Sequence, residues 1–259
     1  MVHLPALRAV LLGASNVTLS LPAWVAKLRG AAGGPVEVLA ACGNGRSYGI
    51  ESRFLFLRRL PGILDCGLWE ELARRPPLPT VALAADIGND ILYEQPVERI
   101  AGWVDTSLVR LAGQGARAVL ATSSLPVIEG VGPLRYLAVR TFFFPGRTLP
   151  FAPARERALA LDAALRRLAA ARDVPLLVPE PSWYRGDPIH LRPSCRGLAC
   201  DAALAAWGLP CRTPAPPPDP RRRRGLLGLP FHRERFCGVT LRTAQPALLY
   251  ADGTSVSFF

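Results

Sequence analysis

Short apolar segments recur along this chain at intervals that leave room for a helix between successive segments. They cover residues 9–12, 36–41, 80–85, 118–121 and 175–178. Each is short and apolar on both faces, which is typical of parallel strands covered by helices. Strands that alternate with helices build a mostly parallel sheet. The sequence therefore predicts an α/β fold.

The segments between these strands carry helical patterns. We expect helices at 22–28, 50–59, 68–75, 97–112, 153–172 and 194–207. Pro22 can open the first helix, and Gly30 ends it. The segment 153–172 is the clearest, because Leu161 and Leu165 fall on an apolar face and Arg166 falls outside it.

The composition changes beyond residue 212. A chain of 259 residues suits one large domain, or one domain with a small appendage. Residues 214–224, rich in proline and arginine, indicate a linker. The segments 236–243 and 247–259 then have strand patterns, and Asp252-Gly253 marks a hairpin turn in the second.

We therefore divide the chain into an α/β domain at 1–212 and a linker with a β-hairpin appendage at 213–259. A lone hairpin is only marginally stable in water, so this one must pack on the α/β domain or on a second subunit. The second arrangement would make the protein a homo-oligomer through the hairpin. We expect the appendage to be dispensable for a catalytic site in the first domain.

The formal charge of +11 raises the question of nucleic-acid binding. Nearly all of the positive charge is arginine, since Lys27 is the only lysine, and this indicates biased codon usage. The one cluster, at 221–224, adjoins the proline run and is typical of a solvated linker. Basic and aromatic residues do not interleave in a stripe. We expect no nucleic-acid partner.

The six cysteines form no C-x-x-C pair, and no Cys/His spacing indicates zinc. The first twelve residues lack a basic segment followed by an apolar stretch of signal-peptide length. No apolar run is long enough to span a bilayer. We therefore expect a cytoplasmic protein with reduced thiols, no metal and no membrane span.

The segment 134–144 is unusually aromatic and contains Tyr136 and Phe142 to Phe144. One interpretation is a helix packed on the core. The other is a lid or wall over an apolar pocket.

Polar residues follow the predicted strands at the points where ligands bind in parallel α/β sheets. Ser15 follows the first strand and the turn around Gly45 follows the second. Asn89 follows the third, and Asp187 and His190 precede the last helix. The carboxyl ends of parallel strands share one edge, so we expect these residues to meet there.

That set suffices for acyl transfer. His190 can accept the proton of the Ser15 hydroxyl, which is a weak nucleophile without a base. Asp187 can fix the tautomer of that imidazole. The backbone N–H groups of Ser15 and Gly45 and the amide of Asn89 can stabilise the oxyanion. Each element alone has an ordinary explanation, such as a helix cap, a turn or a surface loop. Their joint occurrence in this order favours a catalytic site.

The chain resembles the SGNH (GDSL-like) hydrolases, a family named for four blocks that contribute Ser, Gly, Asn and His. "LLGASN" resembles the first block, "GNGRSYG" the second, "DIGND" the third and "DPIHL" the fourth. The resemblance covers roughly residues 6–208. It implies a three-layer α/β/α sandwich with a flavodoxin-like sheet and ester hydrolysis without a metal or organic cofactor. It also implies Ser15 as nucleophile, Asp187 and His190 as its partners, and Gly45 and Asn89 in the oxyanion hole.

One position departs from the family pattern. The usual first block reads G-D-S, and Ala14 stands here in place of the aspartate. That aspartate is not the proton acceptor, but it helps to organise the loop. The G-x-S-x-G elbow of α/β-hydrolases is absent, because Val17 stands where the second glycine would be.

These observations favour an esterase or carbohydrate deacetylase that acts on a small-molecule or carbohydrate ester. The alternative is a non-catalytic relative that binds an acylated or sugar ligand. We expect Arg46, Asp90 and Arg192 to contact the substrate. The aromatic segment indicates an apolar acyl site, whereas Arg46 and Arg192 indicate an anionic or polyhydroxylated leaving group.

Overall fold

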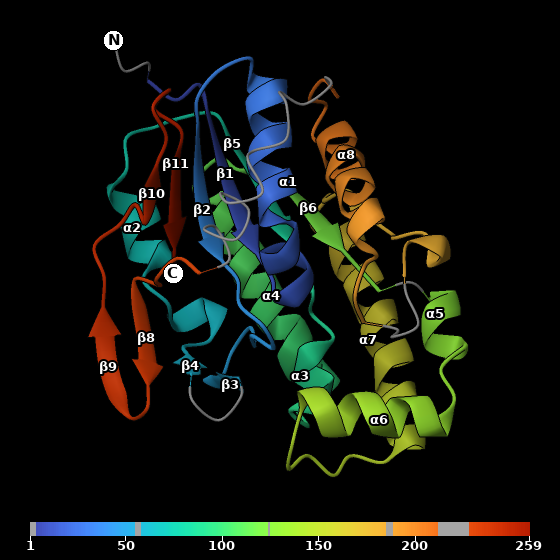
Figure 1. Cartoon of the computed structure of the whole chain (residues 1–259). Coiled ribbons are helices and arrows are strands. Elements are labelled where there is room, and N and C mark those ends of the chain that lie inside the picture. Colours follow the sequence, from blue (N-terminus) through green and yellow to red (C-terminus); the bar gives the residue numbers. More distant parts are fainter. Residues whose placement is uncertain (1–3, 55–57, 124, 185–188, 212–227) are drawn as a thin grey trace.

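A seven-stranded, mostly parallel sheet forms the centre of the molecule (Figure 1). The computed structural model describes residues 4–54, 58–123, 125–184, 189–211 and 228–259. The strands of this sheet are, in spatial order, β10 (Leu248–Leu249), β11 (Ser255–Phe258), β2 (Val36–Ala41), β1 (Leu7–Leu12), β5 (Thr80–Ala84), β6 (Arg117–Ala121) and β7 (Leu176–Leu177). From β2 to β7 the order is that of flavodoxin-like sheets.

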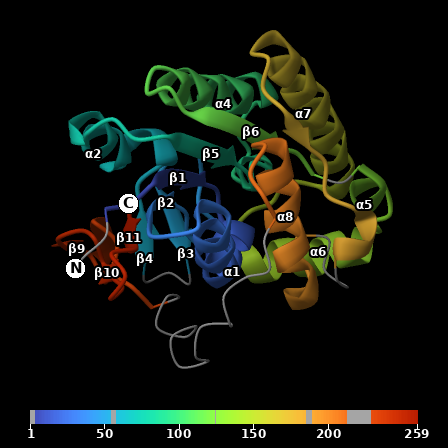
Figure 2. The same ribbon diagram turned by 90° about the horizontal axis from the view of Figure 1, so that it is seen from above.

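Helices cover both faces of this sheet, as the view from above shows (Figure 2). One face carries α1 (Ser15–Ala32) and α8 (Arg196–Ala206), and the other carries α2 (Leu68–Arg74), α4 (Val97–Ala112) and α7 (Phe151–Ala171). The shorter helices are α3 (Asn89–Leu92), α5 (Leu125–Glu129) and α6 (Pro133–Phe143). None of the helices in the described ranges is long and apolar enough to cross a bilayer.

Alternate residues of each central strand enter different cores. Val38 and Ala40 of β2 pack in the cluster that contains α1 and α8. Leu39 and Ala41 pack in the cluster that contains α2, α4 and α7. Because both faces are buried, the central strands are apolar at most positions, with exceptions such as the ion-paired Arg8 and Glu37. The predicted three-layer α/β/α fold is confirmed.

The first helix begins earlier than we expected. We placed its start at Pro22, but α1 begins at Ser15 and contains Pro22 in its interior. A proline there removes one backbone hydrogen bond, a local cost that packing of α1 on the core outweighs. The earlier start puts Ser15 at the helix N-terminus.

The expected helix at 50–59 is wrong. The chain instead forms β3 (Ser52–Phe54) and β4 (Arg58–Leu60), which pair antiparallel. Strand β4 pairs in turn with β8 (Arg233–Phe236), and β8 pairs with β9 (Val239–Arg242), which gives a small second sheet. We also expected one strand at 236–243. The structure instead has a turn at Cys237 and Gly238, both with positive φ, which separates β8 from β9.

The segment after residue 227 is built into both sheets. The expected hairpin at Asp252-Gly253 is confirmed, with β10 and β11 antiparallel. However, β11 also pairs in parallel with β2 and so extends the central sheet. The hairpin thus packs on the α/β body, which is one of the two arrangements that we expected. The expected linker at 214–224, with its arginine run, lies outside the described residues.

Candidate active site

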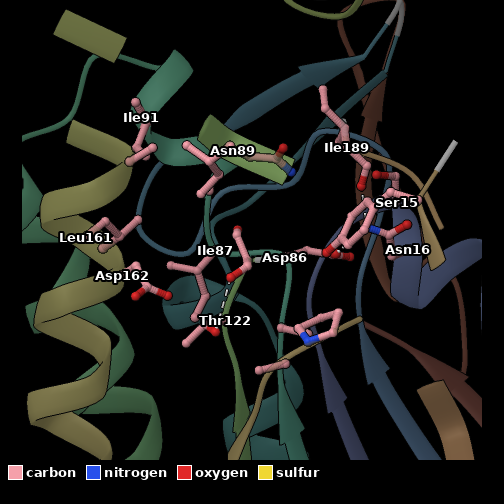
Figure 3. Close-up of a pocket in the computed structure, with 18 of the residues that line it drawn as sticks. Ser15, Asn16, Asp86, Ile87, Asn89, Ile91, Thr122, Leu161, Asp162 and Ile189 are labelled. Carbon is pink, nitrogen blue, oxygen red and sulfur yellow. Dashed lines mark hydrogen bonds between the residues drawn. The ribbon is translucent and has the colours of Figure 1, made fainter. Parts of the chain in front are cut away.

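A cavity of about 250 Å³ opens at the carboxyl ends of β1, β5 and β6. The strand order reverses between β1 and β5, and ligands of such sheets bind at this switch point. Ser15, Asp86 and Asn89 all line the cavity. Figure 3 shows Ser15 and Asn16 on one side of it and Leu161 and Asp162 on the opposite side.

Ser15 is held in a tight turn between β1 and α1. Gly13 allows this turn, because a Cβ atom there would lie 2.5 Å from Cγ2 of Val17. Ser15 is the first residue of α1 and is 7% exposed. The first N–H groups of a helix have no partner inside it and carry partial positive charge. The turn therefore places a serine hydroxyl beside donors that suit an oxyanion.

The carboxylate of Asp86 fastens this turn to the end of β5. Its Oδ2 accepts hydrogen bonds from the N–H groups of Ala14, at 2.9 Å, and Val17, at 3.1 Å. Its Oδ1 accepts one from Nδ2 of Asn16 at 2.9 Å. Asp86 has a φ of 56°, in the left-handed region that Asp tolerates better than most residues. A carboxylate thus organises the serine loop from the neighbouring strand, although residue 14 is alanine.

Asn16 joins the serine turn to the segment that carries His190. Its Nδ2 donates to the carbonyl oxygen of Ile189 and its Oδ1 accepts from the N–H of Leu191, both at 2.9 Å. These are the two neighbours of His190 in the chain. Asn16 also neighbours Ser15, so one side chain fixes the backbone around both predicted catalytic residues.

His190 lies half-buried against α6. Its ring centroid is 5.1 Å from that of Phe143, with the planes tilted by 57°. Asp187, which we expect to orient His190, lies outside the described residues. Ser15 and Asn89 line the cavity, and so do Ile189 and Leu191, the chain neighbours of His190.

Two residues that follow Asn89, Asp90 and Tyr93, connect this part of the chain to the turn around Gly45. The Asp90 carboxylate accepts hydrogen bonds from Oγ of Ser47 and from the N–H of Tyr48. The Tyr93 hydroxyl donates to the carbonyl oxygen of Gly45 at 2.6 Å. Gly45 has a φ of 66°, which favours glycine. These contacts connect the turn of Gly45 to the segment that begins at Asn89, so the two expected oxyanion donors outside the serine turn lie on connected parts of the chain.

Burial changes the acidity of this unit. Removal from water raises the pKa of Asp90 from 3.8 to about 6, because it disfavours the charged form, and hydrogen bonds from Ser47 and Tyr48 oppose the shift. Burial likewise raises the pKa of the Tyr93 hydroxyl.

Two of the three expected substrate contacts have structural partners instead. Arg46 is fully buried, and its guanidinium donates to the carbonyl oxygens of Cys42, Pro61 and Phe259. Asp90 is also fully buried, and neither residue is part of the cavity lining. A direct contact with substrate is therefore not supported at Arg46 or Asp90. Arg192 is exposed and donates from Nε to the carbonyl oxygen of Tyr184, a cavity residue, at 2.7 Å.

The walls of the cavity away from Ser15 are mostly apolar and come from α5, α6 and α7. Tyr136 and Val139 of α6 line it, and no residue of α6 is fully buried. The aromatic segment is therefore a helix, and it forms part of a pocket wall. Phe142 is 74% exposed on its outer side.

The residues described by the structure contain no group of three or more His, Cys, Asp or Glu side chains that could hold a metal ion. Asn16 and Asp86 are the functional candidates that sequence reasoning missed. Both are polar residues directly after a strand, next to residues that we did select, and this position was the available signal.

No known family model and no curated protein matches the chain. The solved structure of an aryl esterase from M. smegmatis matches 78% of this chain and 100% of its own, with a TM-score of 0.52 and 15% identity. Est24, a carbohydrate acetylesterase from Sinorhizobium meliloti, matches 78% of this chain and 99% of its own, with a TM-score of 0.50 and 15% identity. At such identities the matches establish the fold alone: this chain has the α/β fold of the SGNH (GDSL-like) esterases.

Proposed function

We propose that the protein is a serine hydrolase that cleaves carboxylic esters through an acyl-enzyme. The observation that carries this proposal is the clamp by Asn16, which fixes the backbone on both sides of His190 next to the Ser15 turn. A nucleophile and a base held by one side chain have little purpose in a protein that only binds.

In the proposed mechanism, Oγ of Ser15 attacks the ester carbonyl carbon while His190 accepts its proton. The N–H groups of Ser15 and Gly45 and the Asn89 amide stabilise the oxyanion. The alcohol leaves with the proton from His190, and Asp187 stabilises the imidazolium in between. Water, activated by His190, then releases the acid and restores Ser15.

The lining of the cavity supports an apolar acyl group. Side chains such as Leu83, Ile91, Val139 and Leu165 offer few partners to a sugar. We therefore place esters of aliphatic acids ahead of acetylated carbohydrates, and a panel of both substrate classes separates these alternatives.

A fluorophosphonate probe tests the nucleophile. We expect the native chain to be labelled and the Ser15→Ala variant not to be. Ser20→Ala is the matched control, because Ser20 is a buried serine of α1 that also lines the cavity.

His190→Ala should lose turnover and His232→Ala should not. Labelling of Ser15→Ala at the native rate would refute the mechanism. Ester binding without labelling or hydrolysis would favour the non-catalytic alternative.

A further inference from the structure

Asp162 is a buried carboxylate on the cavity wall opposite Ser15 (Figure 3). It belongs to α7, and its side chain is 4% exposed. Its Oδ2 accepts a hydrogen bond from Nε of Arg166, one helical turn along, at 2.6 Å. Its Oδ1 is buried and has no hydrogen-bond partner among the described residues.

An acceptor left without a partner in a protein interior is costly and calls for an explanation. The contrast with Asp86 is informative, because both oxygens of that cavity carboxylate accept hydrogen bonds from the protein. The neighbours of Asp162 in the cavity lining are largely apolar and include Ile87, Leu161 and Leu165. Within the described part of the chain, the protein therefore provides no donor to Oδ1.

We propose that Asp162 accepts a hydrogen bond from a hydroxyl group carried on the acyl chain of the substrate. The inference rests on the proposed esterase function and specifies its substrate class as hydroxyacyl esters. Arg166 already balances the charge of Asp162. A neutral donor satisfies Oδ1 without adding net charge to an apolar cavity, whereas an ammonium group would leave an excess positive charge there.

The hydroxyl group that Asp162 binds fits the acyl part of the ester better than the alcohol part. The acyl group stays attached to Ser15 through both steps, whereas the alcohol must depart after the first. A buried carboxylate that held the alcohol would delay its release. Held on the acyl chain, the same hydrogen bond orients the ester for attack by Ser15 and for the later attack by water.

The test compares p-nitrophenyl esters of ω-hydroxy acids with those of the plain acids, over chain lengths from hexanoyl to decanoyl. At the chain length that reaches Asp162, we expect the hydroxyacyl ester to have a kcat/KM about tenfold or more higher, as for a hydrogen bond to a charged group. Equal kcat/KM values at every length would overturn the proposal.

Variants then assign the effect to Asp162. Asp162→Leu should abolish the preference and raise kcat/KM for the plain esters. Asp162→Asn keeps an oxygen acceptor and should retain part of the preference. Glu156→Leu changes an exposed acid of the same helix and should leave the ratio unaltered. An unchanged ratio in Asp162→Leu would assign Asp162 to the helix ion pair alone.

A binding measurement separates this inference from the proposed function. Calorimetry on the Ser15→Ala variant compares ω-hydroxyhexanoate to ω-hydroxydecanoate with the matching plain acids. Tighter binding of one hydroxy acid, lost in the double variant with Asp162→Leu, supports the inference even if no ester is hydrolysed. If plain esters are hydrolysed but neither the kinetics nor the calorimetry shows a preference for the hydroxyacyl compound, the esterase function is supported and the role of Asp162 is overturned.

Discussion

At the scale of single residues, two side chains connect loops that are far apart in the sequence. Asp86 holds the serine turn to β5, and Asn16 holds the same turn to the backbone on either side of His190. Neither side chain has to touch the substrate, so both act as positioning residues. An error of about 1 Å in a catalytic group can reduce the rate about a hundredfold.

Replacement of Asn16 tests this role. Asn16→Leu removes both hydrogen bonds to the His190 segment, so we expect kcat to fall about ten- to a hundredfold with little change in KM. Thr18→Val is the control, because it removes a 2.7 Å hydrogen bond to Ala14 in the same turn without touching that segment. Steady-state kinetics with a p-nitrophenyl ester provide the measurement. Equal losses in the two variants would indicate a general weakening of the turn.

Asp90 makes stability depend on pH in an unusual direction. Its pKa is raised by burial to about 6 in the folded protein, from 3.8, so folding favours the protonated form. The stability that protonation contributes is fully present below the unfolded pKa and is lost as the pH rises through about 6. Relative to Asp90→Asn, the native chain should lose about 1 kcal/mol of unfolding free energy between pH 5 and pH 7. Urea titrations at both pH values measure it, and a constant difference would contradict the raised pKa.

At the scale of elements, helix α7 closes the apolar part of the cavity. Ala154, Ala158 and Leu165 present one face of it to the space beside Ser15. The small side chains of Ala154 and Ala158 leave space there, which the proposed mechanism assigns to the acyl chain.

A larger side chain on this face should shorten the accepted acyl group. We expect Ala158→Phe to lower kcat/KM for decanoyl esters about tenfold or more while acetyl esters are hydrolysed nearly as before. The ratio of the two substrates is the measurement. A parallel loss for both chain lengths would mean that the acyl group lies elsewhere.

Elements defined by local pattern were predictable, and those defined by distant partners were not. The strand at 36–41 and the helix at 97–112 match β2 and α4. Strands β3 and β4 were expected as a helix, because they form a sheet with β8, which pairs with β4 from more than 150 residues away. The same distinction applies to the site. Ser15 and Asn89 could be selected from sequence motifs, whereas the hydrogen bonds between Asn16 and the His190 segment could be found only from the folded structure.

At the scale of the whole molecule, the central sheet includes residues from both ends of the described chain. Val256 and Phe258 of β11 are buried, and the rings of Phe258 and Phe231 pack edge to face, with centroids 5.5 Å apart. The change of composition near residue 212 indicated a separate appendage. Composition cannot report that β11 pairs with β2.

Substitutions in the hairpin should affect stability strongly in its buried strand, β11, and weakly in its exposed strand, β10. Phe258→Ala should lower the unfolding free energy by about 3–5 kcal/mol, because it leaves a cavity in the core. Leu249→Ala, at a residue that is 64% exposed in β10, should change it by less than about 0.5 kcal/mol. Denaturant unfolding gives both values. A small effect of Phe258→Ala would indicate that the hairpin contributes little to the stability of the α/β domain. A change of oligomeric state in Leu249→Ala would indicate that a second subunit binds at β10.

The pairing of β11 with β2 also determines when the central sheet can be completed during synthesis. The register joins Val38 to Val256, so β2 waits for its outer neighbour while more than two hundred further residues are added. At cellular rates of chain elongation this interval lasts roughly ten to forty seconds. Throughout it, the backbone donors and acceptors on one edge of β2 are open to other chains. An interior strand of the finished sheet is therefore an unpaired edge strand during most of synthesis, when non-native pairing is easiest.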